Sequence, residues 1–302
     1  MKEITDILRF WEARRGERLA LATLVAAHGS SYRRPGARML ISEAGESAGG
    51  VSAGCIEHEV IACAREVLRA EIPRMLTFDT RLRFGCHGSI EVFVEPVLDE
   101  VMTQLHACMR ERQRCRLATF VVGDAPGTRI APFEPVAGAF VQEFEPALRL
   151  VLVGDSDDTT ALRAHAALLG WEVLAFAAAP VPEECLDDRV AVVIATHNFG
   201  RDCAALRGLL PLGLRYVGLV GARRRRDDIL FDVLDRGAPP KSALYAPAGL
   251  YLGADSPEEI ALSIVAEIQC VFGAGTGQQL RQRKAPIHQP APGALACAAS
   301  VP

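Results

Sequence analysis

Two glycine-flanked segments in the first half of the chain each hold a cysteine that could act as a nucleophile or as a metal ligand. The first, Gly54-Cys55-Ile56-Glu57, runs directly into a segment with helical periodicity. A thiol just before a helix lies near the positive end of the helix dipole, which favours the reactive thiolate form. Thiolates also bind soft metals, and we count molybdenum among the candidates. The alternative is an inert, buried Cys55, which is the commoner role of a single cysteine.

The second segment is Gly85-Cys86-His87-Gly88, where an imidazole stands beside the thiol. A polar, glycine-rich loop, GSSYRRPGAR, occupies residues 29–38 between two predicted strands. Its guanidinium groups suit a phosphate, which arginine binds through paired, charge-assisted hydrogen bonds. Two cysteine loops together with this basic loop favour a functional role for the first half of the chain.

Further polar residues in the second half of the chain stand where predicted strands end. His197 follows a buried strand, and Asp202 in the next helix could orient its imidazole; a helix cap beside a loop histidine without function is an equally good interpretation. Gly221 and Arg223 follow the next strand, where backbone N–H groups and a guanidinium can hold an anion. The arginines at 224–226 need no role beyond a solvated surface.

The same half lacks the features of a dinucleotide site. Its first strand ends in GDSDDT, residues 154–159, which has one glycine where a dinucleotide fold normally has three. Three carboxylates follow Gly154 at the start of a predicted helix, where they suit the helix dipole and repel a phosphate. The second strand ends in AFAAAP, without the acidic residue that binds ribose hydroxyls. Helix capping is therefore the simpler role for this turn.

The elements that position the cysteine loops mix helical and strand patterns in the first 146 residues. Helical periodicity covers residues 2–15, 57–70 and 99–112. Strand patterns cover residues 19–30, 37–42, 75–80, 89–97, 116–123 and 137–144. We expect turns over residues 43–50 and in the Pro/Gly-rich stretch after residue 123.

After residue 146 strands alternate with helices, which predicts βαβ units and a parallel sheet. The strands are expected at 148–154, 171–177, 191–197 and 215–221, and the helices at 159–169, 202–210, 223–236 and 257–270. The fold class is therefore α/β, a mixed α+β domain over residues 1–146 followed by a Rossmann-like domain over residues 147–272. Residues 273–302, rich in Gly, Pro, Ala and Gln, are predicted to form a disordered tail.

Composition excludes several classes of function. The 302 residues carry a formal net charge of -4, and the pI of about 6.0 argues against nucleic acid as a partner. No apolar run approaches the length of a membrane span, and the N-terminus lacks the apolar core of a signal peptide. The nine cysteines are odd in number and include no CxxC pair, so neither a zinc knuckle nor a disulfide framework is indicated. We expect a cytoplasmic protein.

Taken together, the motifs resemble those of the XdhC/CoxI family. In the first half they are HGSSYRRPGARMLIS, GGVSAGCIEHEV and FGCHGSIEVFVEP. In the second half they include LGWEV, ATHNFGRD, YVGLVGARRR and GLYLGADSPEEIALSIVAEI. The resemblance spans about residues 5–272 with the motifs in the same order. It implies an accessory protein that binds molybdenum cofactor (molybdopterin) and helps to deliver it to xanthine dehydrogenase and related molybdenum hydroxylases.

The resemblance also assigns site residues. Cys55 matches the family's cysteine and becomes the candidate metal ligand, with Gly54 and Glu57 beside it. The other candidate cofactor-binding residues lie in the remaining motifs: Ser30, Arg34, Gly36, Arg38, Cys86, His87, Gly154, His197, Gly221 and Arg223. His87 stands where relatives commonly have glycine, and GDSDDT replaces a more glycine-rich turn. The His87 departure leaves the role of its own loop open. The changed turn and the missing acidic residue after the second strand weigh against dinucleotide binding here.

The function that follows is a cofactor chaperone without turnover of its own, which protects molybdenum cofactor and delivers it. The alternative is an NAD(P)-dependent oxidoreductase, for which the predicted parallel sheet is the only support. A third interpretation, a scaffold that binds only a partner protein, predicts no small ligand. Expected partners are a molybdenum hydroxylase, a cysteine desulfurase that supplies sulfur, and a second copy of the chain in a homodimer. Neither nucleic acid nor a membrane is expected as a partner.

Overall fold

The computed structural model describes residues 2–29, 31–79, 88–236 and 239–284. Its chain divides into two compact units, with the boundary between Pro146 and Ala147. Three of the candidate site residues, Ser30, Cys86 and His87, lie outside the described residues. Each unit is described below by itself.

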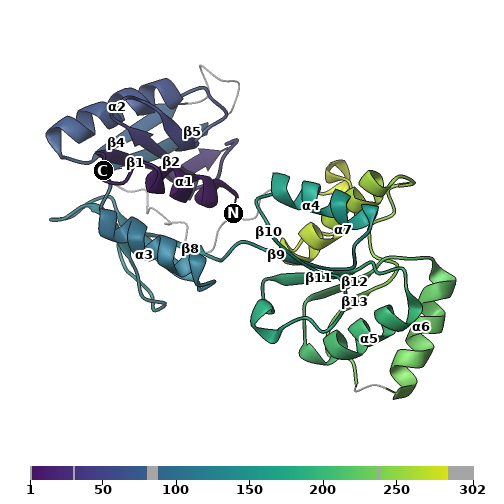
Figure 1. The fold of residues 1–302 in the computed structure, drawn as a ribbon. Coiled ribbons are helices and arrows are strands. Elements are labelled where there is room, and N and C mark those ends of the chain that lie inside the picture. Colours follow the sequence, from purple (N-terminus) through teal and green to yellow (C-terminus); the bar gives the residue numbers. More distant parts are fainter. Residues whose placement is uncertain (1, 30, 80–87, 237–238, 285–302) are drawn as a thin grey trace. The chain divides into compact units, whose positions relative to one another are not determined.

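The first unit is built on a five-stranded antiparallel sheet with the order β3-β2-β1-β5-β4 (Figure 1). Its strands are β1 (Leu19–Gly29), β2 (Arg38–Ser42), β3 (Ser47–Gly49), β4 (Arg74–Asp79) and β5 (Gly88–Pro96). The sequence predicted four of these strands but not β3. That strand consists of three small residues inside a turn-rich stretch, which is too short for an alternating pattern to show.

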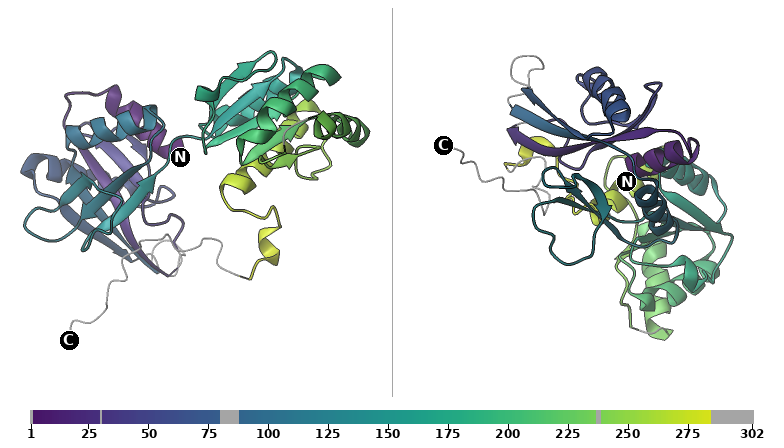
Figure 2. Two further views of the ribbon diagram at one scale, coloured as in Figure 1. Left: turned by 90° about the horizontal axis from the view of Figure 1, so that it is seen from below. Right: turned by 90° about the vertical axis from the view of Figure 1, so that its left-hand side faces the viewer.

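Helices cover both faces of this sheet, as the two views in Figure 2 show. Helix α2 (Glu57–Ala70) packs on one face, where Ala20, Ala22 and Leu24 of β1 point. Helices α1 (Lys2–Glu12) and α3 (Asp99–Arg110) pack on the other, where Leu19 and Leu21 point. Burial on both faces explains why β1 reads as a continuous apolar run rather than as alternation.

A small antiparallel sheet with the order β7-β6-β8 completes the first unit. It comprises β6 (Cys115–Phe120), β7 (Gly127–Ile130) and β8 (Phe140–Phe144). Its inner residues join the core beneath α1 and α3. The sequence predicted β6 and β8 but treated β7 as part of a turn, because its four residues lie between Pro/Gly clusters.

The second unit is a parallel sheet with helices on both faces, which confirms the predicted fold class. The strand order is β10-β9-β11-β12-β13, and all pairs are parallel. The strands are β9 (Arg149–Val153), β10 (Glu172–Phe176), β11 (Val190–Ile194), β12 (Tyr216–Leu219) and β13 (Leu244–Tyr245). The two-residue β13 was not predicted. Central strands β9 and β11 are buried throughout, as parallel sheets covered on both sides require.

Helices α4 (Asp157–Leu168) and α7 (Pro257–Phe272) pack on one face of the parallel sheet, and α5 (Phe199–Leu209) and α6 (Arg223–Arg236) on the other (Figure 1). Short 3-10 turns occur at Glu183–Cys185, Leu210–Leu212 and Leu280–Gln282. The last of these turns lies within the stretch that the sequence assigns to the tail. Within the described parts of the chain, no helix combines the length and apolarity needed to cross a membrane.

Candidate functional site

Two of the sequence motifs meet where β2 begins and β3 ends. The start of β2 lies opposite Thr23 of β1, and the end of β1, Gly29, pairs with Gly88 of β5. The Arg38 carbonyl at the start of β2 accepts the Gly50 N–H just after β3, at 2.8 Å. The loop that leads into β2 and the loop of residues 50–56 therefore leave the sheet next to each other.

In the second of these loops the Cys55 side chain is exposed to solvent. The next residue, Ile56, is 1% exposed and inserts into the core between α2 and the sheet. Gly54, with φ of 103°, makes the turn that precedes the cysteine, a backbone conformation that residues other than glycine adopt only with strain. The anchoring of Ile56 and this turn hold Cys55 at the surface, which contradicts the alternative that it is a buried core residue.

The hydroxyl of Ser52 is the centre of the hydrogen bonds in this loop. Its Oγ accepts from the Gly54 N–H at 3.1 Å, the Cys55 N–H at 3.2 Å and the Cys55 thiol at 3.4 Å. The same hydroxyl donates to Glu57 Oε2 at 2.6 Å. Ser52 therefore links the thiol to the carboxylate, a role that the sequence analysis did not identify.

The Glu57 carboxylate closes the loop onto the first turn of α2. Besides the Ser52 hydroxyl, it accepts the Ser52 N–H at 3.0 Å and the Ile56 N–H at 3.1 Å. Partial burial acts to raise the pKa of Glu57, but these hydrogen bonds, with the Ser52 hydroxyl foremost, outweigh burial and lower it below the ordinary 4.5. Glu57 thus stays ionised at neutral pH and acts on Cys55 through Ser52 rather than by direct contact.

The basic loop of residues 30–37 is fixed from inside the unit. Arg33 forms an ion pair with Glu3 of α1. Gly36 is buried with φ of 101°, and a Cβ atom there would lie 2.6 Å from the side-chain nitrogen of Gln142 on β8. Arg34 lies on the exposed part of the loop. The Arg34 side chain is thus exposed on this loop, and Arg33 ties the loop to α1.

Arg38 differs from its neighbours because its side chain is only 2% exposed. The guanidinium donates to Gln142 Oε1 at 2.5 Å and to Thr23 Oγ1 at 3.3 Å. Burial lowers the pKa of Arg38 to about 10, against the opposing charge of Glu95. Its described contacts are internal, so Arg38 would affect ligand binding by positioning the loop of residues 30–37.

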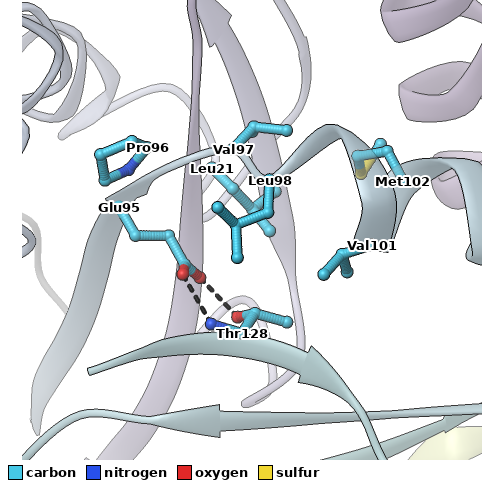
Figure 3. Close-up of a pocket in the computed structure, with 8 residues that line it drawn as sticks. All are labelled: Leu21, Glu95, Pro96, Val97, Leu98, Val101, Met102 and Thr128. Carbon is cyan, nitrogen blue, oxygen red and sulfur yellow. Dashed lines mark hydrogen bonds between the residues drawn. The ribbon is translucent and has the colours of Figure 1, made fainter. Parts of the chain in front are cut away.

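A small pocket in the first unit lies between β5, α3 and the small sheet (Figure 3). Glu95 is its charged residue, 3% exposed, and accepts the Thr128 N–H at 2.7 Å as well as the Thr128 hydroxyl. Burial raises the pKa of Glu95. Most of the remaining lining is apolar: Leu21, Pro96, Val97, Leu98, Val101 and Met102. None of these residues is among the candidate site residues predicted from the sequence, although Glu95 and Pro96 end the motif FGCHGSIEVFVEP.

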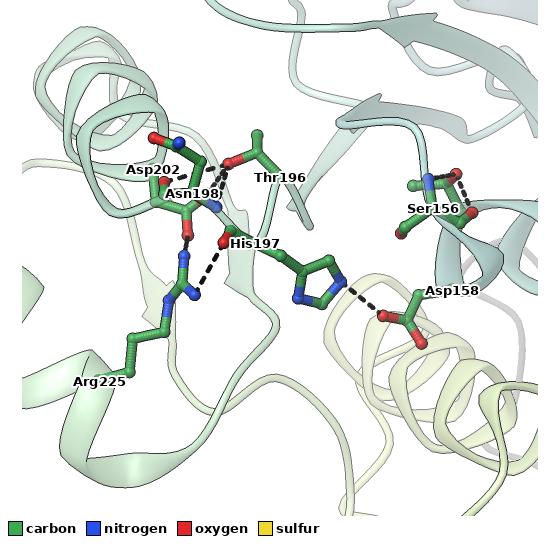
Figure 4. Close-up of polar contacts among 8 residues, drawn as sticks. Ser156, Asp158, Thr196, His197, Asn198, Asp202 and Arg225 are labelled. Carbon is green, nitrogen blue, oxygen red and sulfur yellow. Dashed lines mark hydrogen bonds and ion pairs between the residues drawn. The ribbon is translucent and has the colours of Figure 1, made fainter.

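In the second unit, the candidate residues lie at the carboxyl ends of the parallel strands. His197 has φ of 52°, and its Nε2 lies 3.0 Å from Asp158 Oδ2 at the start of α4 (Figure 4). The expected partner, Asp202, is instead 1% exposed and bonds Thr196 and Arg225, each at 2.5 Å. The prediction that Asp202 orients the imidazole is wrong, because the left-handed backbone turns the ring toward α4 and away from α5.

Gly154 and Gly221 both lie near the carboxyl ends of the parallel strands, but their roles in the backbone differ. A Cβ atom at Gly154 would lie 2.3 Å from the Ala195 carbonyl oxygen, so the turns after β9 and β11 approach too closely for any other residue. Gly221, with φ of 148°, ends the strand segment before α6, and Arg223 begins that helix with an exposed side chain. In an open parallel sheet the carboxyl edge where the strand order reverses is the usual ligand crevice. Here the His197–Asp158 contact spans that edge between β9 and β11.

Among the described residues, no group of three or more His, Cys, Asp or Glu side chains is arranged to hold a metal ion.

The sequence was compared with models of known protein families. Residues 12–79 match the model of the XdhC and CoxI family, and residues 150–268 match the model of the XdhC Rossmann domain. The chain belongs to the XdhC and CoxI family. The match confirms the family resemblance of the motifs around Cys55 and of the parallel-sheet unit.

Individual relatives match most of this family member. A Bacillus subtilis protein named as a probable subunit of xanthine dehydrogenase is 28% identical over 83% of this chain and 92% of the relative. The molybdenum cofactor insertion chaperone PaoD of Escherichia coli is 25% identical over 85% of this chain and 84% of the relative. A crystal structure of a protein from Bacillus halodurans described as a xanthine dehydrogenase has a TM-score of 0.74 and 24% identity. The match covers 90% of this chain and 97% of that protein, and this likeness bears on the fold alone.

Proposed function

We propose that this chain is an accessory protein that binds molybdenum cofactor, protects it and delivers it to a xanthine dehydrogenase-type molybdenum hydroxylase. The observation that carries the proposal is the exposed Cys55 thiol, held on a hydrogen-bonded loop beside the basic loop of residues 30–37. The proposal is supported by the name of one relative, a molybdenum cofactor insertion chaperone.

The residues present fit the chemistry of this cofactor, a pterin dithiolene with a terminal phosphate. Cys55 offers a soft sulfur ligand for the metal, and thiolates suit soft metal ions. Arg34 lies on the exposed part of its loop, and an arginine suits a phosphate. When bound, the cofactor supplies the redox centre of the recipient enzyme. Within this chain it is cargo rather than a resident group.

The role of this chain's own residues would be to bind the cofactor and to orient it. The Ser52 hydroxyl and the Glu57 carboxylate hold the loop so that the Cys55 sulfur faces outward. If Cys55 ligates the metal, it would do so as the thiolate. In the structure the Cys55 thiol donates to Ser52 Oγ at 3.4 Å.

The proposal includes further partners that follow from the delivery role. The recipient is a molybdenum hydroxylase, and a cysteine desulfurase supplies the sulfur that such enzymes carry on the metal. A homodimer is proposed as the working assembly. The binding roles of Ser30, Cys86, His87, Gly154, His197, Gly221 and Arg223 stay predictions.

Pterin analysis tests the proposal. The protein is produced in a host that makes molybdenum cofactor, purified, and oxidised so that any bound pterin becomes fluorescent. Wild-type protein should carry pterin, and Cys55→Ala should lose most of it. Cys270→Ala removes a half-buried thiol from the second unit and serves as the matched control, with pterin content unchanged. Equal pterin in wild type and Cys55→Ala, or none in either, would overturn the proposal.

An NAD(P)-dependent oxidoreductase stays the alternative from the sequence. Titration of the purified protein with NADPH and NADH, followed by nucleotide fluorescence, separates the two functions. A saturable fluorescence change would favour the alternative, whereas the carrier function predicts none at micromolar protein.

A further inference from the structure

Arg38 connects three parts of the first unit through its backbone. It is the first residue of β2, and its N–H donates to Glu3 Oε1 of α1 at 2.9 Å. Its carbonyl accepts the Gly50 N–H at 2.8 Å, at the start of the Cys55 loop. Glu3 also pairs with Arg33. The position of Arg38 is therefore transmitted both to the basic loop and to the cysteine loop.

The guanidinium of Arg38 is held by the small sheet. Its Nη1 donates to Gln142 Oε1 at 2.5 Å, and its central carbon lies 4.9 Å from the ring centroid of Phe144. Nη2 has no hydrogen-bond partner among the described residues. Since a buried, charged donor without a partner is costly, the acceptor on Gln142 contributes strongly to keeping this side chain in place.

The same Gln142 amide supports the turn of the basic loop. A Cβ atom on Gly36 would lie 2.6 Å from Gln142 Nε2 and 2.9 Å from its amide carbon, so the amide packs directly against the turn. Behind the turn, the Gly36 N–H donates to the Leu24 carbonyl at 2.7 Å. Gln142 thus touches the turn and the buried arginine at once, from a strand 104 residues away from Arg38.

We propose that Gln142 is a positioning residue for the loop of residues 30–37, fixing Arg38 and the Gly36 turn so that Arg34 is presented in one place. The inference rests on the proposed function where it assigns Arg34 to the cofactor phosphate. It makes the small sheet part of the binding apparatus, although its own strands carry no residue of the family motifs. A shift of the small sheet against the large one would move the loop.

Hydrogen exchange on the full-length, cofactor-free chain tests the positioning directly. In Gln142→Leu, which keeps the bulk but removes the acceptor, the Gly36 and Gly50 amides should exchange about 10- to 100-fold faster. Gln142→Glu keeps a side-chain oxygen for Arg38 and should restore protection. Glu143→Gln is the matched control, because Glu143 points to the other face of β8 and pairs with Arg114. Its exchange should match wild type.

Two outcomes would overturn the inference: unchanged exchange of both amides in Gln142→Leu, or equal loss of protection in Gln142→Leu and Gln142→Glu. If Gln142→Leu unfolds the first unit, Gln142→Asn takes its place, because its shorter amide cannot reach Arg38 and packing is nearly kept. Pterin content is measured in parallel, with a clear loss expected for Gln142→Leu. A wild-type protein without pterin refutes the proposed function, while the exchange data still decide the role of Gln142.

Discussion

Replacing Glu57 by glutamine removes the charge from the carboxylate that closes the Cys55 loop and keeps its shape. Oε1 accepts the Ser52 N–H, and Oε2 accepts both the Ser52 hydroxyl and the Ile56 N–H. In a glutamine amide one of these two positions becomes an NH2 group, which faces donors and loses at least one hydrogen bond. Hydrogen bonds to charged groups contribute about 1.5–3 kcal/mol each, and partial exposure of this site reduces that value. We expect the free energy of unfolding of the first unit to fall by about 1–2 kcal/mol.

The lowered pKa of Glu57 determines how this difference in stability changes with pH. Hydrogen bonds lower the pKa of Glu57 below 4.5, and an acid with a lowered folded-state pKa stabilises the fold above its unfolded pKa. That stabilisation is lost as the pH falls through the lowered value. The difference between wild type and Glu57→Gln should therefore be full at about pH 7 and shrink steadily once the pH falls below the ordinary pKa of a glutamate.

The chain offers a clean assay for this difference. It contains two tryptophans, Trp11 in the first unit and Trp171 in the second. In a Trp171→Phe background, urea unfolding followed by tryptophan fluorescence reports on Trp11, which is 1% exposed. Glu59→Gln, in the same first turn of α2, controls for the helix dipole. A wild-type to Glu57→Gln difference that stays constant from about pH 7 to about pH 3.5 would refute the role of the charge.

Two further predictions concern the second unit. Its unfolding is followed through the fluorescence of Trp171 in a Trp11→Phe background. Gly154→Ala should destabilise this unit by about 3 kcal/mol or more, because a Cβ there meets the Ala195 carbonyl oxygen at 2.3 Å and φ is 131°. Gly208 lies inside α5, and a Cβ atom added there meets nothing within 4 Å, so Gly208→Ala should instead stabilise the unit by about 0.5–1 kcal/mol. Equal changes in stability from Gly154→Ala and Gly208→Ala would contradict this reasoning. Asp202→Asn should cost about 2–4 kcal/mol, because it removes the buried charge that faces Arg225, and an unchanged urea midpoint would contradict this account.

Sequence reasoning located the elements well where hydrophobic periodicity decides them. The predicted helix over residues 57–70 agrees with α2 at both ends, since its apolar face is regular and Gly54 stands just before it. The parallel sheet was predicted from the alternation of strands with helices after residue 146, as β9, α4, β10, β11 and α5 show. Strands β3, β7 and β13 were missed because runs of two to four residues carry no readable period.

The polar contacts were harder to predict, because they depend on distances between residues remote in sequence. The partner of His197 is Asp158, 39 residues earlier, whereas the sequence pointed to the nearby Asp202. Gln142 carries no motif, and only the fold brings it to Arg38. Ser52 was the exception that could have been found, because it lies three residues before Cys55, a spacing at which a serine hydroxyl commonly accepts a backbone N–H.

The distribution of contacts in the first unit separates residues that hold the loops from residues that would meet cargo. The side chains of Glu3, Arg38, Ser52 and Glu57 make hydrogen bonds or ion pairs within the unit, while the Cys55 side chain is exposed and contacts Ser52. In the proposed carrier function, the cargo has to be released as well as held. Rigid support beneath the exposed Cys55 sulfur would reduce the entropy that the loop loses on binding.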